Sequence, residues 1–118
     1  MNRRYILYHG TGLENAKRIM REGLKPKPYI YLSPDIAVAR EFANTKQMYP
    51  ASVKPVPRRP AVFEVTLYDS DFRDMINHGV PPRVVRERFR VLQDVMKHKF
   101  WEYLWYFNIP PDRLRRIE

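Results

Sequence analysis

The chain has 118 residues, with 22 Lys and Arg against 13 Asp and Glu, which gives a formal net charge of +9 and a pI near 10.0. It contains no cysteine, and this excludes disulfides and thiolate-based metal or redox chemistry. The length suits one small domain, so we expect a single domain over residues 1–118. The first apolar run is too short for a signal sequence or a membrane span, so we expect a cytoplasmic protein that does not enter a membrane.

The excess of positive charge favours a polyanionic partner, and nucleic acid, either DNA or RNA, is the first candidate. A solvated basic surface without a partner is the alternative. The chain also has 11 prolines, only 4 glycines and many arginines, and such stiff, charged compositions recur in proteins from hot environments. A thermophilic source is therefore a hypothesis that the composition suggests.

Taken in chain order, the first elements are a strand and a helix joined by a glycine-containing turn. Residues 5–9, "YILYH", have the aromatic and aliphatic composition of a strand. The "GTG" that follows predicts a turn in which Thr11 caps the next helix. Apolar residues then recur at helical spacing over residues 13–22, and Gly23 is placed to end that helix.

A second strand and helix follow, and then a long segment without periodicity. "YIYLS", residues 29–33, predicts a strand, and Ser33 is the expected cap of a helix over residues 34–44. Residues 45–60 are polar and rich in proline, so we expect a long mobile loop there.

The second half predicts one strand, two helices and two further strands. "AVFEVTLY", residues 61–68, is the clearest strand, and helices are expected over residues 69–78 and 81–97. "WEYLWYF", residues 101–107, predicts a strand, and residues 109–118 predict a turn and a final strand. Because strands and helices do not alternate to the end of the chain, the order β-α-β-α-β-α-α-β-β predicts an α+β fold.

His9 is the first candidate for chemistry because it stands at a strand end beside glycine. There its ring can reach a cleft, while the following turn leaves backbone N–H groups free for a ligand. An ordinary surface or core histidine is the alternative. His78 and His98 have no spacing to His9 that would form a metal site, so no metal is expected.

Two aromatic segments add further candidates. Tyr29 and Tyr31 alternate with aliphatic residues and so share one face, which suits either ligand stacking or a half-buried strand. Glu102 lies within a run of aromatic residues, where a carboxylate is costly to bury without partners and where acid–base or cation-stabilising groups are found. A solvent-exposed glutamate at a strand edge is the alternative.

Three segments, "YHGTGLENAKRIMREGL", "YIYLSPDIAVAREFA" and "EYLWYFNIPPDRLRRI", resemble in this order the His-Tyr-Glu motifs of the ADP-ribosyltransferase superfamily, nearest to its poly(ADP-ribose) polymerase and diphtheria-toxin branch. The resemblance implies a single-domain ADP-ribosyltransferase-like fold with a small split β-sheet core flanked by helices. It implies that NAD+ is the co-substrate and that ADP-ribose is transferred to a macromolecule, with nucleic acid as a candidate acceptor. A compact transferase of this kind would suit a toxin or a viral effector.

The same resemblance implies a role for each matching residue. His9 would bind a ribose hydroxyl of NAD+, and the Gly10 backbone would hold the nicotinamide carboxamide. Tyr31 would stack on the nicotinamide ring, with Phe42 as a second aromatic residue, and Glu102 would stabilise the oxocarbenium-like state as nicotinamide leaves. Less direct assignments are Thr11 and Ser33 near the carboxamide and Arg3 and Arg4 near the pyrophosphate.

The chain is also similar to the NAD-binding lobe of the RNA 2′-phosphotransferases, which share the superfold and use NAD+ to remove a 2′-phosphate from spliced tRNA. The matching segments are "HGT", "LSPDIAVA" and "PRRPAVFEV", the last of which contains Arg58 and Arg59. Those enzymes hold RNA with an additional N-terminal lobe that has no counterpart here, and they do not rely on a glutamate like Glu102. We therefore expect ADP-ribosyl transfer first and 2′-phosphotransfer as the alternative. A non-catalytic module that binds NAD+, ADP-ribose or nucleic acid is the third interpretation.

Overall fold

The computed structural model describes residues 2–46, 56–98 and 102–118, and its elements follow the predicted order. The first half contains β1 (Arg4–Gly12), a 3₁₀ turn (Leu13–Asn15), α1 (Ala16–Glu22), β2 (Ile30–Leu32), α2 (Ile36–Asn44) and β3 (Thr45–Lys46). The second half contains β4 (Val56–Pro57), β5 (Pro60–Tyr68), α3 (Asp69–Asn77), α4 (Pro82–His98), β6 (Tyr103–Trp105), a 3₁₀ turn (Pro111–Arg113) and β7 (Leu114–Arg116). The predicted α+β class is confirmed.

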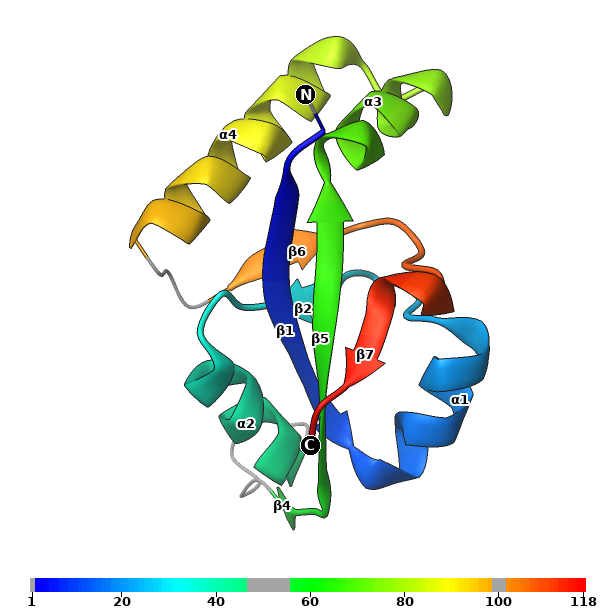
Figure 1. Cartoon of the computed structure of the whole chain (residues 1–118), viewed down its shortest axis with the longest axis vertical. Coiled ribbons are helices and arrows are strands. Elements are labelled where there is room, and N and C mark those ends of the chain that lie inside the picture. Colours follow the sequence, from blue (N-terminus) through cyan, green and yellow to red (C-terminus); the bar gives the residue numbers. More distant parts are fainter. Residues whose placement is uncertain (1, 47–55, 99–101) are drawn as a thin grey trace.

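The strands form separate antiparallel sheets. The largest has the order β1-β5-β7, β2 pairs with β6, and β3 pairs with β4. Figure 1 shows β1 and β5 running side by side through the middle of the molecule, with α2 and α1 on either side of their lower part and α3 and α4 at the other end. A bridge between Tyr8 and Ser33 joins β1 to the residue that follows the last residue of β2. This junction positions the candidate site.

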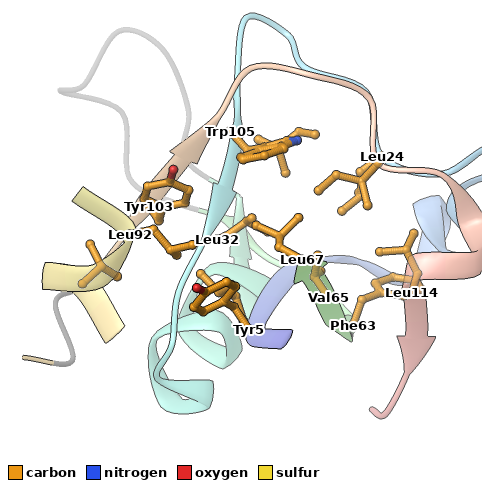
Figure 2. Close-up of a cluster of buried hydrophobic side chains, with 14 of the residues drawn as sticks. Tyr5, Leu24, Leu32, Phe63, Val65, Leu67, Leu92, Tyr103, Trp105 and Leu114 are labelled. Atoms are coloured by element: carbon orange, nitrogen blue, oxygen red, sulfur yellow. The ribbon is translucent and has the colours of Figure 1, made fainter. Parts of the chain in front are cut away.

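The core lies between the large sheet and the β2–β6 ribbon. Phe63, Val65 and Leu67 alternate along β5 and point into this core, where Tyr103 and Leu32 of the ribbon meet them (Figure 2). Each of these side chains is almost fully buried, so the hydrophobic effect holds the ribbon against the sheet. The opposite face of β5 is covered by α2.

The predicted turn at residues 10–12 is wrong. These residues belong to β1 and pair with β5 as far as Gly12, which lies opposite Pro60. They stay paired because β5 begins one residue earlier than expected, at Pro60. Thr11 is therefore not a helix cap, and its buried hydroxyl accepts a hydrogen bond from the Asn15 side chain at 3.0 Å. The prediction for Gly23 is confirmed, since it ends α1 with a φ of 81° and donates to the Ile19 carbonyl.

Other boundaries also differ from expectation. Ser33 does not cap α2, because the helix begins only at Ile36. The Ser33 hydroxyl accepts from the Asp35 N–H in the turn before the helix, and the Asp35 carboxylate accepts from the Ala37 N–H in its first turn. The expected loop over residues 45–60 carries the short strands β3 and β4 at its ends, and residues 47–55 lie outside the described residues. In the described part of the chain, none of the helices has the length and apolar character that crossing a membrane requires.

Candidate functional site

His9 lies in β1 and contacts the backbone of β2. Its Nδ1 lies 2.8 Å from the Tyr31 carbonyl oxygen. A carbonyl oxygen only accepts hydrogen bonds, so this contact assigns the hydrogen to Nδ1 and leaves Nε2 as an acceptor in the neutral ring. A neutral His9 can therefore accept a hydrogen bond from a ligand hydroxyl group.

Burial is the main influence on the protonation of His9. It lowers the pKa of the imidazole below its ordinary value of 6.5, and the nearby charge of Arg58 lowers the pKa further. The hydrogen bond to the Tyr31 carbonyl acts in the opposite direction but does not outweigh burial. The ring is consequently neutral at pH 7.

Gly10 presents backbone groups next to His9. Tyr8 exchanges two backbone hydrogen bonds with Ser33, of 2.7 and 2.9 Å, so its N–H and C=O face β2 rather than β5. Because these directions alternate along an antiparallel strand, the N–H and C=O of Gly10 face the same side. A Cβ at Gly10 would collide with the Ala39 carbonyl of α2, so only glycine allows α2 to lie this close.

An exposed aromatic pair lies beside this backbone edge. The rings of Tyr31, in β2, and Phe42, in α2, stack with centroids 5.7 Å apart and an interplanar angle of 21°. Tyr31 is 38% exposed and Phe42 is 43% exposed, which is unusual for large aromatic side chains held in a stack. Such a surface suits the binding of a planar ring.

Arg58 is anchored at the end of α2. Its guanidinium donates from Nη2 to the Phe42 carbonyl at 2.7 Å and from Nε to the Ala43 carbonyl at 3.2 Å. A cation is favourable there, because the last carbonyls of a helix carry partial negative charge. Its charge also contributes to the lowered pKa of His9. Arg59 is exposed, and its backbone carbonyl accepts from the Leu13 N–H.

Glu102 immediately precedes β6 and is exposed. The next residue, Tyr103, pairs with Leu32, so Glu102 lies beside the Ser33 end of β2. Strand alternation puts it on the same side as Leu104, the partner of Tyr31. In the described part of the chain Glu102 is solvent-exposed, as in the alternative of a glutamate at a strand edge, and its neighbours 99–101 lie outside the described residues.

The remaining predicted residues divide into two groups. Thr11 and Ser33 lie near His9 but are buried, with their backbone or side-chain groups engaged within the chain. Arg3 and Arg4 lie at the opposite end of β1, about 15–20 Å from His9 at the usual strand rise, so the structure does not bring them to the site. Among the described residues, no group of three or more His, Asp or Glu side chains could hold a metal ion.

Sequence reasoning missed Tyr106, which extends the aromatic surface, and named Arg88 only as one of several arginines on its helix that could bind phosphates. Tyr106 contacts Tyr29, and Arg88 lies over the Tyr106 ring. The sequence signal was the alternation within "EYLWY", but only the register between β2 and β6 shows which tyrosine it meets.

The comparisons with known proteins point to one enzyme class. No family model matches the chain. Over 79 residues the chain is 30% identical to a protein of Lacticaseibacillus paracasei described as "Probable RNA 2'-phosphotransferase". The match covers 65% of this chain and 42% of the relative, so the chain spans less than half of that protein's length. The similarity favours the 2′-phosphotransferase alternative over ADP-ribosyl transfer to a macromolecule.

Proposed function

We propose that this chain is an NAD+-dependent transferase of the RNA 2′-phosphotransferase type, which acts on a phosphate group of RNA. The observation that carries the proposal is the placement of Arg58, whose guanidinium is fixed by the Phe42 and Ala43 carbonyls at the end of the helix that supplies Phe42 to the aromatic pair. Two of its five N–H donors are used in the bonds to α2, and the others have no hydrogen-bond partner among the described residues, so they could bind phosphate oxygens. The relative's described activity supports the same assignment.

The other residues of the site fit NAD+ as the co-substrate. Tyr31 and Phe42 offer a stacking surface for the nicotinamide ring, and the Gly10 N–H and C=O match the two halves of its carboxamide. Nε2 of His9 accepts a hydrogen bond from a ribose hydroxyl. Arg58 orients the phosphate so that one of its oxygens attacks C1 of the ribose as the bond to nicotinamide breaks. Nicotinamide leaves as a neutral molecule, and ADP-ribose is then esterified to the RNA phosphate. In a second step the neighbouring ribose hydroxyl attacks the phosphorus, the RNA 2′-oxygen leaves and takes up a proton, and the phosphate departs on ADP-ribose as a cyclic ester.

ADP-ribosyl transfer assisted by Glu102 is the second candidate. The observation that favours it is the position of Glu102 on the same side of the β2–β6 ribbon as Tyr31. A carboxylate there would stabilise positive charge that develops on the ribose. The two candidates differ in whether Arg58 or Glu102 is required.

Nicotinamide release from NAD+ tests the proposal. The assay compares an oligoribonucleotide with one internal 2′-phosphate against the same strand without it, and we expect turnover only with the phosphate. Arg58→Lys keeps a positive charge at α2 but loses the planar fork, so turnover should fall about 100-fold. Glu102→Gln should change turnover less than about threefold, and Arg83→Gln on α4 is the matched control for loss of one exposed positive charge.

Three outcomes would contradict the proposal. Loss of turnover in Glu102→Gln with retention in Arg58→Lys would favour ADP-ribosyl transfer instead. Turnover that is equal with and without the 2′-phosphate would exclude phosphate as the acceptor. NAD+ binding without nicotinamide release in any mixture would favour a non-catalytic binding module.

A further inference from the structure

The outer face of the β2–β6 ribbon carries aromatic side chains beyond the pair at His9. In the ribbon Tyr31 pairs with Leu104, and continuing the same register sets Tyr29 opposite Tyr106. Side chains of the opposite parity face the core, and Figure 2 shows Leu32, Tyr103 and Trp105 among them. Phe42, Tyr31, Tyr29 and Tyr106 thus form a row on the outside of the molecule, which we call the aromatic row.

The rings of the aromatic row are in continuous contact. Beyond the stacked pair of Phe42 and Tyr31, the Tyr31 and Tyr29 centroids are 4.9 Å apart with the rings at 89°. Tyr29 and Tyr106 follow at 6.0 Å and 74°. The Tyr31 hydroxyl donates to the Tyr29 hydroxyl at 3.0 Å, which fixes the two rings relative to each other. Tyr106 is 39% exposed, so the row presents open ring surface at both ends and half-buried Tyr29 between them.

A guanidinium stands at each end of the aromatic row. Arg58 binds the Phe42 carbonyl at one end, and the Arg88 guanidinium carbon lies 4.1 Å from the centroid of the Tyr106 ring at the other. The Arg88–Tyr106 contact is a cation–π interaction, which keeps the positive charge against the ring. Among the described residues of the ribbon, Glu102 is the only carboxylate that the register puts on this side, and it lies at the His9 end. The Tyr106 end is therefore positively charged.

We propose that the aromatic row binds the single-stranded RNA next to the reacting phosphate, an inference that rests on the proposed function. RNA bases would stack on Tyr106 and Tyr29, and a backbone phosphate would bind Arg88. Exposed aromatic rings combined with cations are the chemistry by which proteins hold unpaired strands, because every base has a face that can stack. In a duplex those faces are covered by neighbouring bases, so double-stranded RNA does not fit the row. The net charge of +9 supplies the general attraction to the strand.

Fluorescence anisotropy with a labelled single-stranded oligoribonucleotide tests this proposal. Tyr106→Ala should weaken binding about tenfold, as expected for the loss of one stacked base. Tyr106→Phe keeps the ring and should bind like the unmodified chain. Met20→Ala, on α1, removes an exposed apolar side chain that is not part of the row and is the matched control. Arg88→Gln should lower the dependence of affinity on salt, whereas Arg83→Gln on the same helix should lower it less.

The test separates the aromatic row from the proposed function, because nicotinamide release is measured on the same variants. If RNA binding depends on Tyr106 but the chain never releases nicotinamide, RNA binding by the aromatic row is supported and the proposed transferase activity is contradicted. If turnover depends on RNA but Tyr106→Ala has the same half-saturating RNA concentration as the unmodified chain, the transferase activity is supported and RNA binding by the aromatic row is contradicted. Equal affinity for single-stranded and duplex RNA would also reject the row, since stacking on exposed rings requires unpaired bases. Thermal unfolding of each variant shows that a loss of binding is not a loss of fold.

Discussion

The side chain of His9 in β1 is hydrogen-bonded to the backbone carbonyl of Tyr31 in β2, with Nδ1 and the carbonyl oxygen 2.8 Å apart. The carbonyl is held in place because the neighbouring bridge between Tyr8 and Ser33 fixes where β2 meets β1. One junction between two sheets therefore sets both the tautomer of the imidazole and the direction of its free Nε2. Any change that shifts β2 against β1 would also move the ring.

The lowered pKa of His9 predicts a pH dependence of stability. The unfolded chain binds a proton at this residue more readily than the folded chain, so protonation favours unfolding. The contribution of His9 to the free energy of unfolding should be fully present well above the ordinary pKa of 6.5 and should be lost progressively as the pH falls through that value. Urea unfolding at several pH values would measure this decrease, and His9→Gln should reduce it.

Two features make this pH range informative. The carboxyl groups of Asp69, Glu87 and Glu118 have lowered pKa values, so their contributions are lost only at more acidic pH. His78 is exposed, and His78→Gln is the matched control for replacing a histidine elsewhere in the chain. Equal slopes for the unmodified chain and His9→Gln would show that His9 is not the group responsible.

The close approach of α2 to β1 predicts different effects at two neighbouring glycines. In Gly10→Ala the new methyl group would meet the Ala39 carbonyl, which belongs to the helix backbone and cannot turn aside. Such overpacking should lower the free energy of unfolding by about 1–3 kcal/mol. In Gly12→Ala the methyl group would meet only the Glu14 carboxylate, which can rotate away, so the change should be small. Thermal unfolding of both variants distinguishes the two cases, and equal destabilisation would contradict this account.

The predicted element order was confirmed because it rests on local patterns. Alternation over residues 61–68 and helical spacing over residues 81–97 gave elements within one or two residues of β5 and α4. The turn at residues 10–12 failed because glycine usually breaks a strand, whereas here Gly10 is needed inside one to admit α2. That requirement comes from tertiary packing and has no local signal.

Within the candidate site, the sequence predicts the residues that belong to a recognisable motif. It does not predict which residues become neighbours through strand pairing. His9, Tyr31 and Phe42 were named from the sequence, and the structure brings them together. The contact between the Tyr29 and Tyr106 rings is not predicted from the sequence, because the two residues are far apart in the chain. It depends on the strand register, since a shift of one residue would turn the Tyr106 side chain into the core. Arg3 and Arg4 were assigned by resemblance, and the length of β1 carries them away from the site.

The stacked pair predicts an effect on NAD+ affinity that is independent of turnover. Phe42→Ala removes one ring of the pair and leaves Tyr31 without its neighbour, so NAD+ binding should weaken about tenfold. Phe42→Tyr preserves the ring and should retain binding. Isothermal titration with NAD+ measures both, with Ile76→Ala on α3 as the exposed apolar control. Unchanged affinity in Phe42→Ala would place the nicotinamide ring elsewhere.

The ion pair between Arg113 and Asp71 predicts a stability difference between partly buried and exposed charges. The two groups are 2.6 Å apart with side chains 24% and 17% exposed, and Asp71 also accepts a hydrogen bond from the Tyr68 N–H at 2.7 Å. Asp71→Ala therefore leaves a partly buried guanidinium and a backbone donor without their partner, and should cost about 1–3 kcal/mol of unfolding free energy.

Asp71→Asn separates the charge from the hydrogen bonds in this pair. The amide keeps an acceptor for the Tyr68 N–H but loses the negative charge that faces Arg113, so its destabilisation should lie between those of the unmodified chain and Asp71→Ala. Glu87→Ala removes an equally short contact to Arg90 on the exposed face of α4 and should have almost no effect, because solvent screens that pair. Chemical denaturation of the three variants would measure the order. If Glu87→Ala were as destabilising as Asp71→Ala, partial burial would not explain the strength of the Arg113–Asp71 contact.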